Sequence, residues 1–210
     1  MTTKERYKRF VDYFSIAMPD AATELKFSNT FELLCAVMLS AQCTDKRVNM
    51  ATPALFRAYP SASDLAAAKR DDVYMLIKSV SYPNSKTDHL IGMAQALMER
   101  HKGEVPQSFE ELTALPGVGR KTANVVLSVA FGEARMPVDT HVFRVSRRIG
   151  LASLKCTTPL AVEQTLMRNL PKELMTKAHH WLILHGRYVC KSVSPQCDSC
   201  GIRDFCAKRI

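Results

Sequence analysis

A lysine and an aspartate stand 18 positions apart in this chain, each next to a short motif that could place it for chemistry. Lys121 comes directly after Leu-Pro-Gly-Val-Gly-Arg (115–120), and Asp139 lies within Pro-Val-Asp-Thr-His (137–141). An unprotonated amine can attack a sugar carbon, and a carboxylate can assist that attack and the proton transfers around it. The pair therefore suggests covalent chemistry at a sugar.

The Pro-Gly-Val-Gly string predicts a hairpin between two short helices. Its glycines allow positive φ and the close approach of another backbone. Amides at the start of the following helix point outward at the positive end of the helix dipole, where a phosphate can bind. The backbone at Gly117, Val118, Gly119 and Arg120 is therefore a candidate for gripping DNA without reading its bases. The alternative is an ordinary packing joint between helices.

Lys121 and Asp139 each have a plainer interpretation. A lysine is normally protonated at neutral pH and then pairs with solvent or phosphate. A helix N-terminus, the neighbouring Arg120 and partial burial all disfavour the ammonium form, which favours a nucleophile. Asp139 begins a predicted helix and so is a natural N-cap. Capping uses one carboxylate oxygen, so both roles are compatible.

Four of the seven cysteines lie in the last 21 residues, with gaps of six, two and five residues between Cys190, Cys197, Cys200 and Cys206. An odd number of cysteines with this crowding argues against a disulfide framework and for a metal site. Four thiolates suit either zinc or an iron–sulfur cluster. Zinc ribbons usually have two Cys-x-x-Cys knuckles, and this tail has one.

The rest of the pattern predicts an all-α protein. Helices are expected over 31–40, 84–101, 120–131 and 139–149, with another from Thr158 and a last one through Arg187. Ser108 and Glu111 predict a capping box. Arg144, Arg147 and Arg148 fall on one face of a helix, where they would meet phosphate or solvent. Signals for β-strands and β-hairpins are absent from the sequence.

Composition adds a charge argument. There are 29 Lys and Arg against 20 acids, a net charge of +9, and 47% apolar residues. The excess suggests a polyanionic partner, and the apolar fraction is enough for a sizeable core. Residues 1–20 show no secretory leader, and the longest apolar run is far short of the ~20 residues that span a bilayer. We expect a soluble, intracellular, cytoplasmic protein with no membrane partner.

Taken together, these motifs resemble the endonuclease III family of DNA glycosylases with abasic-site lyase activity. The resemblance includes residues 31–45, the hairpin through Asn124, the Val-Asp-Thr-His segment, residues 180–187 and the cysteine tail. It implies a six-helix lobe at 23–133, with a helix-hairpin-helix at about 108–132. A second lobe, 1–22 with 134–210, is implied to hold a [4Fe–4S] cluster on the four tail cysteines. It further implies a monomer associated with the nucleoid.

The resemblance also implies a reaction on duplex DNA carrying damaged bases or abasic sites, in a groove lined by Lys121 and Asp139. The damaged nucleotide, an oxidised pyrimidine, is flipped out of the stack. The Lys121 amine displaces the base at C1′, Asp139 stabilises positive charge on the sugar, and β-elimination through the resulting Schiff base cuts the strand 3′ to the site. Such a protein is a base excision repair enzyme.

Further residues take implied roles in DNA contact. Gln42 would enter the duplex, Ser40 and Asp45 would lie near the pocket, and His141 and Lys191 would contact phosphate. The family commonly has glycine, an apolar residue and tyrosine before Asn84, whereas this chain has Ser-Tyr-Pro (81–83). Tyr82 then takes the wedge position, where an aromatic ring can stack on bases. The alternative for Tyr82 is a turn residue with a surface ring.

Two other functions remain open. A monofunctional adenine-type glycosylase lacks the lysine, so Lys121 opposes it. A noncatalytic DNA-binding relative would keep the fold, and the unusual Ser81 and Pro83 leave room for it.

Overall fold

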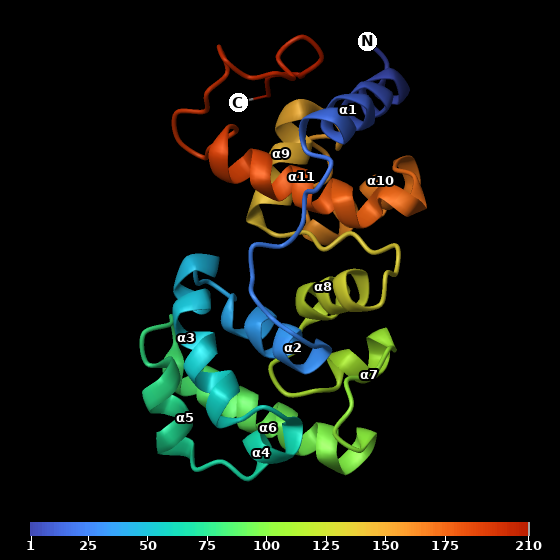
Figure 1. Ribbon diagram of the computed structural model, residues 1–210. Coiled ribbons are helices and arrows are strands. Elements are labelled where there is room, and N and C mark those ends of the chain that lie inside the picture. The colour runs from blue at the N-terminus through green and yellow to red at the C-terminus, as the bar shows by residue number, and fades with distance from the viewer. Residues whose placement is uncertain (210) are drawn as a thin grey trace. The chain divides into compact units, whose positions relative to one another are not determined.

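The computed structural model describes residues 1–209, which form an all-α protein without a β-strand, as expected (Figure 1). Within this part of the chain, no helix is both long enough and apolar enough for a membrane crossing. The helices are α1 (Thr3–Ala17), α2 (Thr30–Leu39), α3 (Asp45–Ala58), α4 (Ala62–Ala66), α5 (Arg70–Ile77), α6 (Pro83–His101), α7 (Phe109–Thr113), α8 (Arg120–Ala130), α9 (Thr140–Ile149), α10 (Pro159–Asn169), the 3₁₀ helix η1 (Lys172–Leu174) and α11 (Met175–Tyr188).

The chain divides into two compact units. Unit 1 joins Met1–Thr23 to Gly132–Ile210, and unit 2 is Glu24–Phe131. Each unit has its own hydrophobic core. The resemblance implied six helices in the central lobe, and unit 2 has seven helical segments, of which α4 and α7 are five residues each.

Helix α2 forms the centre of unit 2. Every residue from Leu33 to Leu39 is buried, and the helix packs against α3, α6 and α8 (Figure 1). Asn29 caps its start by accepting a hydrogen bond from the Glu32 amide at 2.9 Å. A helix that is apolar all round belongs in a core and has little polar surface to offer a ligand. The polar groups near its buried part therefore lie at its two ends, at 29–32 and in the turn at 40–44.

The boundaries of α6 and α7 refine two expectations. Helix α6 starts at Pro83, one residue before the expected start, because proline is well suited to the first helical position. It ends before Lys102 and Gly103, which have φ of +54° and +84°. At α7, the Ser108 hydroxyl accepts from the Glu111 amide at 3.3 Å and bonds to the Glu110 carboxylate at 3.2 Å. Only one half of the expected capping box is therefore formed.

Unit 1 is built around Trp181 on α11. Its ring lies 5.9 Å from those of Phe10 and Phe14, and its Nε1 donates to the Met18 carbonyl at 2.8 Å. These contacts fix the N-terminal helix α1 on the C-terminal third of the chain. A Cβ on Gly186 would lie 2.9 Å from the Val145 side chain, so a glycine here lets α9 and α11 cross closely.

Candidate functional site

The hairpin turn between α7 and α8 is anchored from beneath by two buried side chains. Leu115 and Val118 are 3% and 5% exposed, and the Val118 amide donates to the Leu115 carbonyl at 3.1 Å. Gly117 has a φ of +75°, and a Cβ there would lie 2.7 Å from the Cβ of His89. Only glycine fits this position, for both backbone and packing reasons. The turn predicted from the sequence is thus a built feature of unit 2.

Gly119 is the N-cap of α8, and it leaves the start of that helix open. It has ordinary extended backbone angles and makes no side-chain cap hydrogen bond, and a Cβ built on it meets no atom within 4 Å. Helices α3, α7, α9 and α10 instead have a serine, threonine or aspartate whose side chain caps them. An anion can therefore approach the positive end of α8.

Arg120 and Lys121 form the first turn of α8. The Arg120 guanidinium lies over the Phe109 ring, 5.1 Å from its centroid, and is exposed. Lys121 is half-buried, and the residues from Thr122 to Ser128 behind it are buried. Lys121 therefore lies one residue inside an open helix N-terminus, at the edge of the core of unit 2.

Asn124, one turn further along α8, was not singled out as functional from the sequence. It is 1% exposed, and neither atom of its side-chain amide has a hydrogen-bond partner within the described residues. A buried amide without a partner costs free energy, so such groups are often sites where water or a ligand binds. The sequence signal that could have identified it is its position three residues after Lys121, which places both side chains on the same face of one helix.

Ser40, Gln42 and Asp45 occupy the turn from α2 to α3, as their sequence order requires. The Ser40 hydroxyl donates to the Val37 carbonyl at 2.8 Å and so closes the end of α2. Gln42 is exposed and has a φ of +53°. Asp45 is the half-buried first residue of α3, where the positive end of the helix dipole stabilises a carboxylate.

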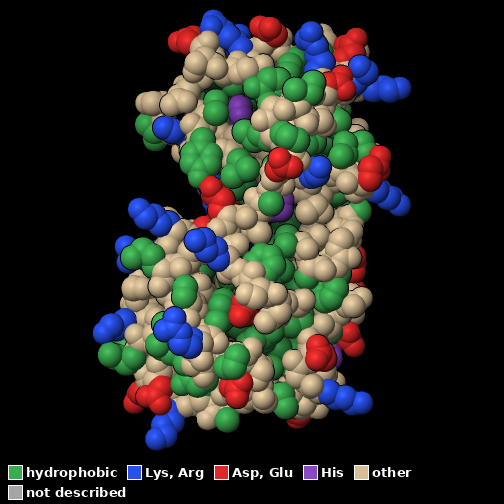
Figure 2. Space-filling model, in the orientation of Figure 1, with side chains coloured by type: hydrophobic (Ala, Val, Ile, Leu, Met, Phe, Trp, Pro, Cys, Tyr) green, Lys and Arg blue, Asp and Glu red, His purple; other side chains and the backbone are tan. Residues whose placement is uncertain are grey.

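Tyr82 is the N-cap of α6 and also belongs to unit 2. It is 64% exposed with a φ of +56°. On the face drawn in Figure 2, Lys and Arg side chains of unit 2 gather on the side where Figure 1 places α3 and α5. The exposed basic residues on or next to those two helices are Lys46, Arg47, Arg57, Lys69, Arg70 and Lys78. Such a surface attracts a polyanion.

Asp139 belongs to unit 1, where it is the N-cap of α9. Its Oδ1 accepts a hydrogen bond from the Val142 amide at 2.8 Å. The cap fixes the orientation of the carboxylate through this one oxygen. His141, in the first turn of α9, is half-buried, and its Nδ1 lies 3.3 Å from the Arg144 guanidinium. Both residues are thus held by α9 itself.

The arginines of α9 bind backbone carbonyls, which corrects the expectation of a phosphate-binding or solvated face. Arg144 donates to the Gly186 and Cys190 carbonyls at 2.9 and 3.1 Å, and Arg148 to those of Lys191 and Ser192 at 2.7 and 3.0 Å. Burial, and then the charge of Arg148, lower the pKa of Arg144. These side chains hold the chain that follows α11.

The four tail cysteines line one pocket of unit 1. Apolar side chains of Ile149, Val189, Pro195 and Ile202 line it with them, together with those of Arg148 and His185. Within residues 1–209, no three His, Cys, Asp or Glu side chains are grouped closely enough to be identified as a site for a single metal ion. Lys191 is exposed, beside the first cysteine.

The donors around these sulfurs suit thiolate ligands. The Lys208 amide lies 3.3 Å from the Cys206 sulfur, His185 Nε2 lies 3.8 Å from that of Cys200, and Arg148 lies 3.9 Å from that of Cys190. Burial and then the neighbouring cysteines raise the pKa of Cys206 and of Cys200. Four crowded thiolates need positive charge among them, and an iron–sulfur cluster with Cys₄ ligation supplies it. The residues present therefore fit the group.

The predicted residues thus fall into two sets. Unit 2 has Ser40, Gln42, Asp45, Tyr82, the hairpin glycines and Lys121, and unit 1 has Asp139, His141, Lys191 and the four cysteines. Lys86, whose side chain lies next to the Gln42 turn, was missed. The sequence signal for it is that Lys86 continues the helical spacing of Leu90, Met93 and Leu97. A lysine therefore stands on the face of α6 that is buried in the core.

Comparison with known proteins identifies the family. The profile of HhH-GPD superfamily base excision DNA repair proteins matches residues 35–172. Endonuclease III of Rickettsia felis is 47% identical, over 94% of this chain and 92% of its own length. Endonuclease III of Escherichia coli K12 is 49% identical over 90% and 88%. A solved structure of a trapped endonuclease III–DNA covalent intermediate superimposes with a TM-score of 0.93 and 44% identity, covering 99% of this chain and 97% of that one. The chain belongs to the endonuclease III family of HhH-GPD base excision repair proteins.

Proposed function

We propose that Lys121 is the nucleophile with which this protein, a bifunctional DNA glycosylase and abasic-site lyase, acts on duplex DNA. The observation that carries the assignment is the position of Lys121, half-buried in the first turn of α8 behind the open N-cap at Gly119. A phosphate at that helix end would bring the sugar–phosphate backbone to the amine. The positive end of the helix dipole there also disfavours an ammonium.

The proposed reaction has two stages. The unprotonated Nζ of Lys121 attacks C1′ of the damaged nucleoside, and the bond from C1′ to the base breaks with its electron pair leaving on the base. Ring opening then gives a protonated Schiff base between Nζ and C1′. The imine acidifies the C2′ hydrogens, so one is lost as a proton and the C3′–O bond breaks, which cuts the strand on the 3′ side. Water finally releases Lys121.

We assign Asp139 to the charge and proton movements of this reaction. Its Oδ1 is committed to the α9 cap, so Oδ2 is the oxygen assigned to the positive charge that develops on the sugar. A carboxylate fixed in this way needs little reorganisation as charge develops. The same oxygen is suited to take a proton from the Lys121 amine or return one to it.

DNA contact is assigned to the turns of unit 2 and to two residues of unit 1. The backbone at Gly117, Val118, Gly119 and Arg120 would hold phosphate. Gln42 and Tyr82 would fill the gap left by the flipped nucleotide, with Ser40 and Asp45 near its pocket. His141 and Lys191 would add phosphate contacts. Oxidised pyrimidines are the proposed substrates, and Tyr82 is the residue whose change from the family pattern bears on lesion preference.

Cys190, Cys197, Cys200 and Cys206 would hold a [4Fe–4S] cluster. When bound, it would supply a covalent cross-link within the C-terminal loop that follows α11, and no step of the reaction passes through it. Arg148 would meet both this loop and the first cysteine, since it binds the Lys191 and Ser192 carbonyls. We also propose that the protein acts as a monomer in the cytoplasm, at the nucleoid, with lobes at 23–133 and at 1–22 with 134–210.

Borohydride trapping on duplex DNA with one abasic site tests the assignment of Lys121. The wild type should give a covalent protein–DNA complex, because borohydride reduces the Schiff base to a stable amine. Lys121→Ala and Lys121→Arg should give none, and both should bind the duplex within about threefold of wild type, because phosphate binding is assigned to the hairpin backbone, which neither substitution removes. Lys121→Arg keeps the charge but has no unprotonated nitrogen.

The other outcomes discriminate between functions. Trapping by either variant would overturn the assignment of Lys121. Adenine release by wild type without trapping would favour a monofunctional glycosylase, and tight binding with neither would favour a noncatalytic protein. A panel of duplexes with oxidised, reduced and alkylated bases then identifies the preferred lesion.

A further inference from the structure

Two turns of unit 2 each contain a residue in the left-handed backbone region. Gln42, between α2 and α3, has a φ of +53°, and Tyr82, before α6, has a φ of +56° and a ψ of +51°. Neither is a glycine, and Tyr82 is further restricted because it precedes Pro83. A residue other than glycine stays in this region only when its surroundings fix it there. Both turns must therefore be held by their neighbours.

Lys86 makes contacts with the backbone of both turns. Its Nζ donates to the Leu39 carbonyl at 2.7 Å and to the Ala41 carbonyl at 2.7 Å, directly before Gln42. Its own backbone amide makes the first hydrogen bond of α6, to the Tyr82 carbonyl at 3.1 Å, as any residue at this position would. One residue thus connects the start of α6 to the end of α2.

Burial makes this an unusual use of a lysine. Lys86 is 8% exposed, and burial lowers its pKa. A charged group is retained in such a place only where it is well paired. Here the partners are the carbonyl of Leu39, the last residue of α2 at the negative end of the helix dipole, and that of Ala41 in the turn after it. Apolar side chains of similar size would fill the space but leave both carbonyls without these donors.

A second contact runs between the same two turns in the opposite direction. Arg47, in the first turn of α3, donates to the Ser79 carbonyl at 2.9 Å, in the segment that leads to Tyr82. The start of α3 is thereby tied to the approach to α6. The two turns are therefore connected from both sides.

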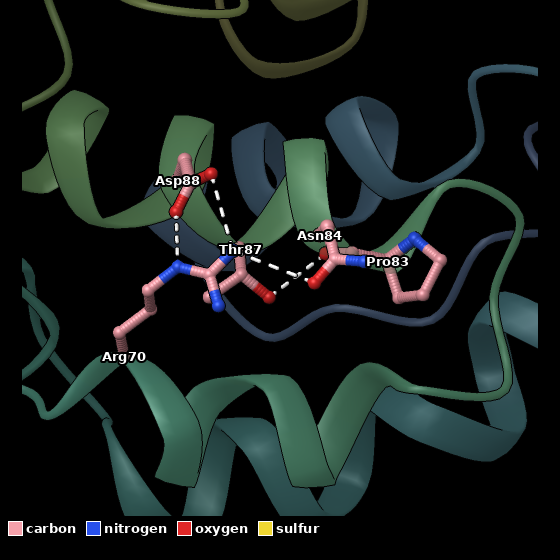
Figure 3. Close-up of polar contacts among 5 residues, drawn as sticks. All are labelled: Arg70, Pro83, Asn84, Thr87 and Asp88. Carbon is pink, nitrogen blue, oxygen red and sulfur yellow. Dashed lines mark hydrogen bonds and ion pairs between the residues drawn. The ribbon is translucent and has the colours of Figure 1, made fainter.

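The start of α6, directly after Tyr82, is fixed by a set of polar contacts shown in Figure 3. Arg70 of α5 reaches across to α6, where its Nε donates to Asp88 at 2.7 Å and its guanidinium contacts Asn84 at 3.4 Å. The Thr87 hydroxyl donates to the Pro83 carbonyl at 2.8 Å. The first turn of α6 thus has little freedom to follow Tyr82 if that residue moves.

We propose that Lys86 is a positioning residue that couples the Gln42 and Tyr82 turns, so that the two side chains meet the DNA as one preformed unit. The inference rests on the proposed function, which assigns DNA contacts to both residues. Without the Lys86 ammonium, the Gln42 turn loses its side-chain link to α6 and is free to leave the left-handed conformation. Gln42 would then have to be ordered again beside Tyr82 during binding, which weakens its contribution to affinity.

A mutant cycle on DNA binding tests the coupling. The probe is a duplex that carries a tetrahydrofuran abasic analogue, which cannot react. Gln42→Ala should weaken binding of the wild-type protein by about tenfold, as loss of a well-placed contact does. In the Lys86→Met background the same change should cost less than about twofold. Lys102→Met, at the exposed C-terminal end of α6, is the control: it removes one positive charge but should leave the Gln42→Ala penalty unchanged.

The outcomes separate this inference from the proposed function. If Lys86→Met weakens binding but leaves the Gln42→Ala penalty at its wild-type size, Lys86 has only a structural role and the inference fails. Lys86→Gln keeps a side-chain amide NH2 as donor, so the Gln42→Ala penalty in that background should lie between about twofold and about tenfold. If Lys86→Met does not fold, this intermediate penalty is the result that tests the inference, and a full penalty of about tenfold overturns it. Borohydride trapping by wild type reports on Lys121 independently, so the inference can fail while the proposed reaction stands.

Discussion

Two lysines of unit 2 show how position within a helix decides what an ammonium does. Lys86 points into the core, and its Nζ is committed to two carbonyls at 2.7 Å. Lys121 is half-buried in a first turn, where the helix dipole opposes positive charge. At Lys86 the two carbonyls occupy the amine as a hydrogen-bond donor, although burial lowers its pKa. At Lys121 the helix dipole disfavours the ammonium, which suits the unprotonated amine that a nucleophile requires. Residue type alone does not distinguish the two.

Asp139 combines a cap and a proposed chemical role, and two substitutions separate them. Asparagine also caps helices well, so Asp139→Asn should keep the unfolding free energy within about 0.5 kcal/mol while the trapping rate falls about 100-fold. Asp139→Ala should lose the cap as well, at about 1 kcal/mol. Thermal denaturation and single-turnover trapping with borohydride measure the two effects. A near-wild-type trapping rate for Asp139→Asn would remove the carboxylate from the mechanism.

At the scale of elements, the two hairpin glycines serve different purposes. Gly117 has a φ of +75° and no room for a Cβ, so it makes the turn. Gly119 has ordinary backbone angles and open space around it, so it keeps the start of α8 accessible. The first glycine therefore concerns folding, and the second concerns what can approach the helix.

Matched substitutions test this division. Gly117→Ala should lower stability by at least about 1–2 kcal/mol because the left-handed backbone penalises a side chain. Gly119→Asp should be at least as stable as wild type, because aspartate is a good N-cap, yet bind duplex DNA at least about tenfold more weakly because its charge repels phosphate. Urea unfolding and a fluorescence binding assay give the two quantities. If Gly119→Asp binds DNA normally, α8 does not grip phosphate.

At the scale of the whole molecule, the C-terminal tail forms part of the core of unit 1. Ile202 and Phe205 are buried in that core, and the Arg6 side chain donates to the Phe205 carbonyl at 3.0 Å. The Ala207 amide donates to the Ile149 carbonyl at 3.1 Å. The cysteines thus alternate with residues that pack on α1 and α9. A cluster on these cysteines would connect the tail to the folding of unit 1.

Loss of the cluster should therefore destabilise unit 1. Cys200→Ser should lose iron, sulfide and the visible absorbance of an iron–sulfur cluster. The unfolding transition followed by the fluorescence of Trp181, the single tryptophan, should fall by about 5 °C or more. Cys156→Ser, outside the tail, should change neither property. If the wild-type protein is colourless and contains zinc, the four cysteines form a zinc site and the assignment of an iron–sulfur cluster is wrong.

Much of the local structure followed from the sequence. The apolar run at 33–39, the glycines after the helices and the caps at Ser108, Asp139 and Thr158 each depend on residues a few positions apart, and these local rules hold before any tertiary contact forms. The all-α class and the hairpin were predicted in this way, the family was predicted from the resemblance of motifs along the whole chain, and all three are confirmed. The lobe boundaries and the roles of Lys121 and Asp139 remain predictions.

Contacts between distant segments required the tertiary structure. The arginines of α9 looked like a phosphate-binding or solvated face, but the carbonyls that receive Arg144 and Arg148 lie 42 to 46 positions away. Lys86 looked like any helix lysine until the end of α2 was found against it. The sequence determined which helices form and where they stop, because those depend on near neighbours, and its motifs together identified the family. Which charged side chains support the fold and which face a ligand was decided only when helices far apart in the chain were packed together.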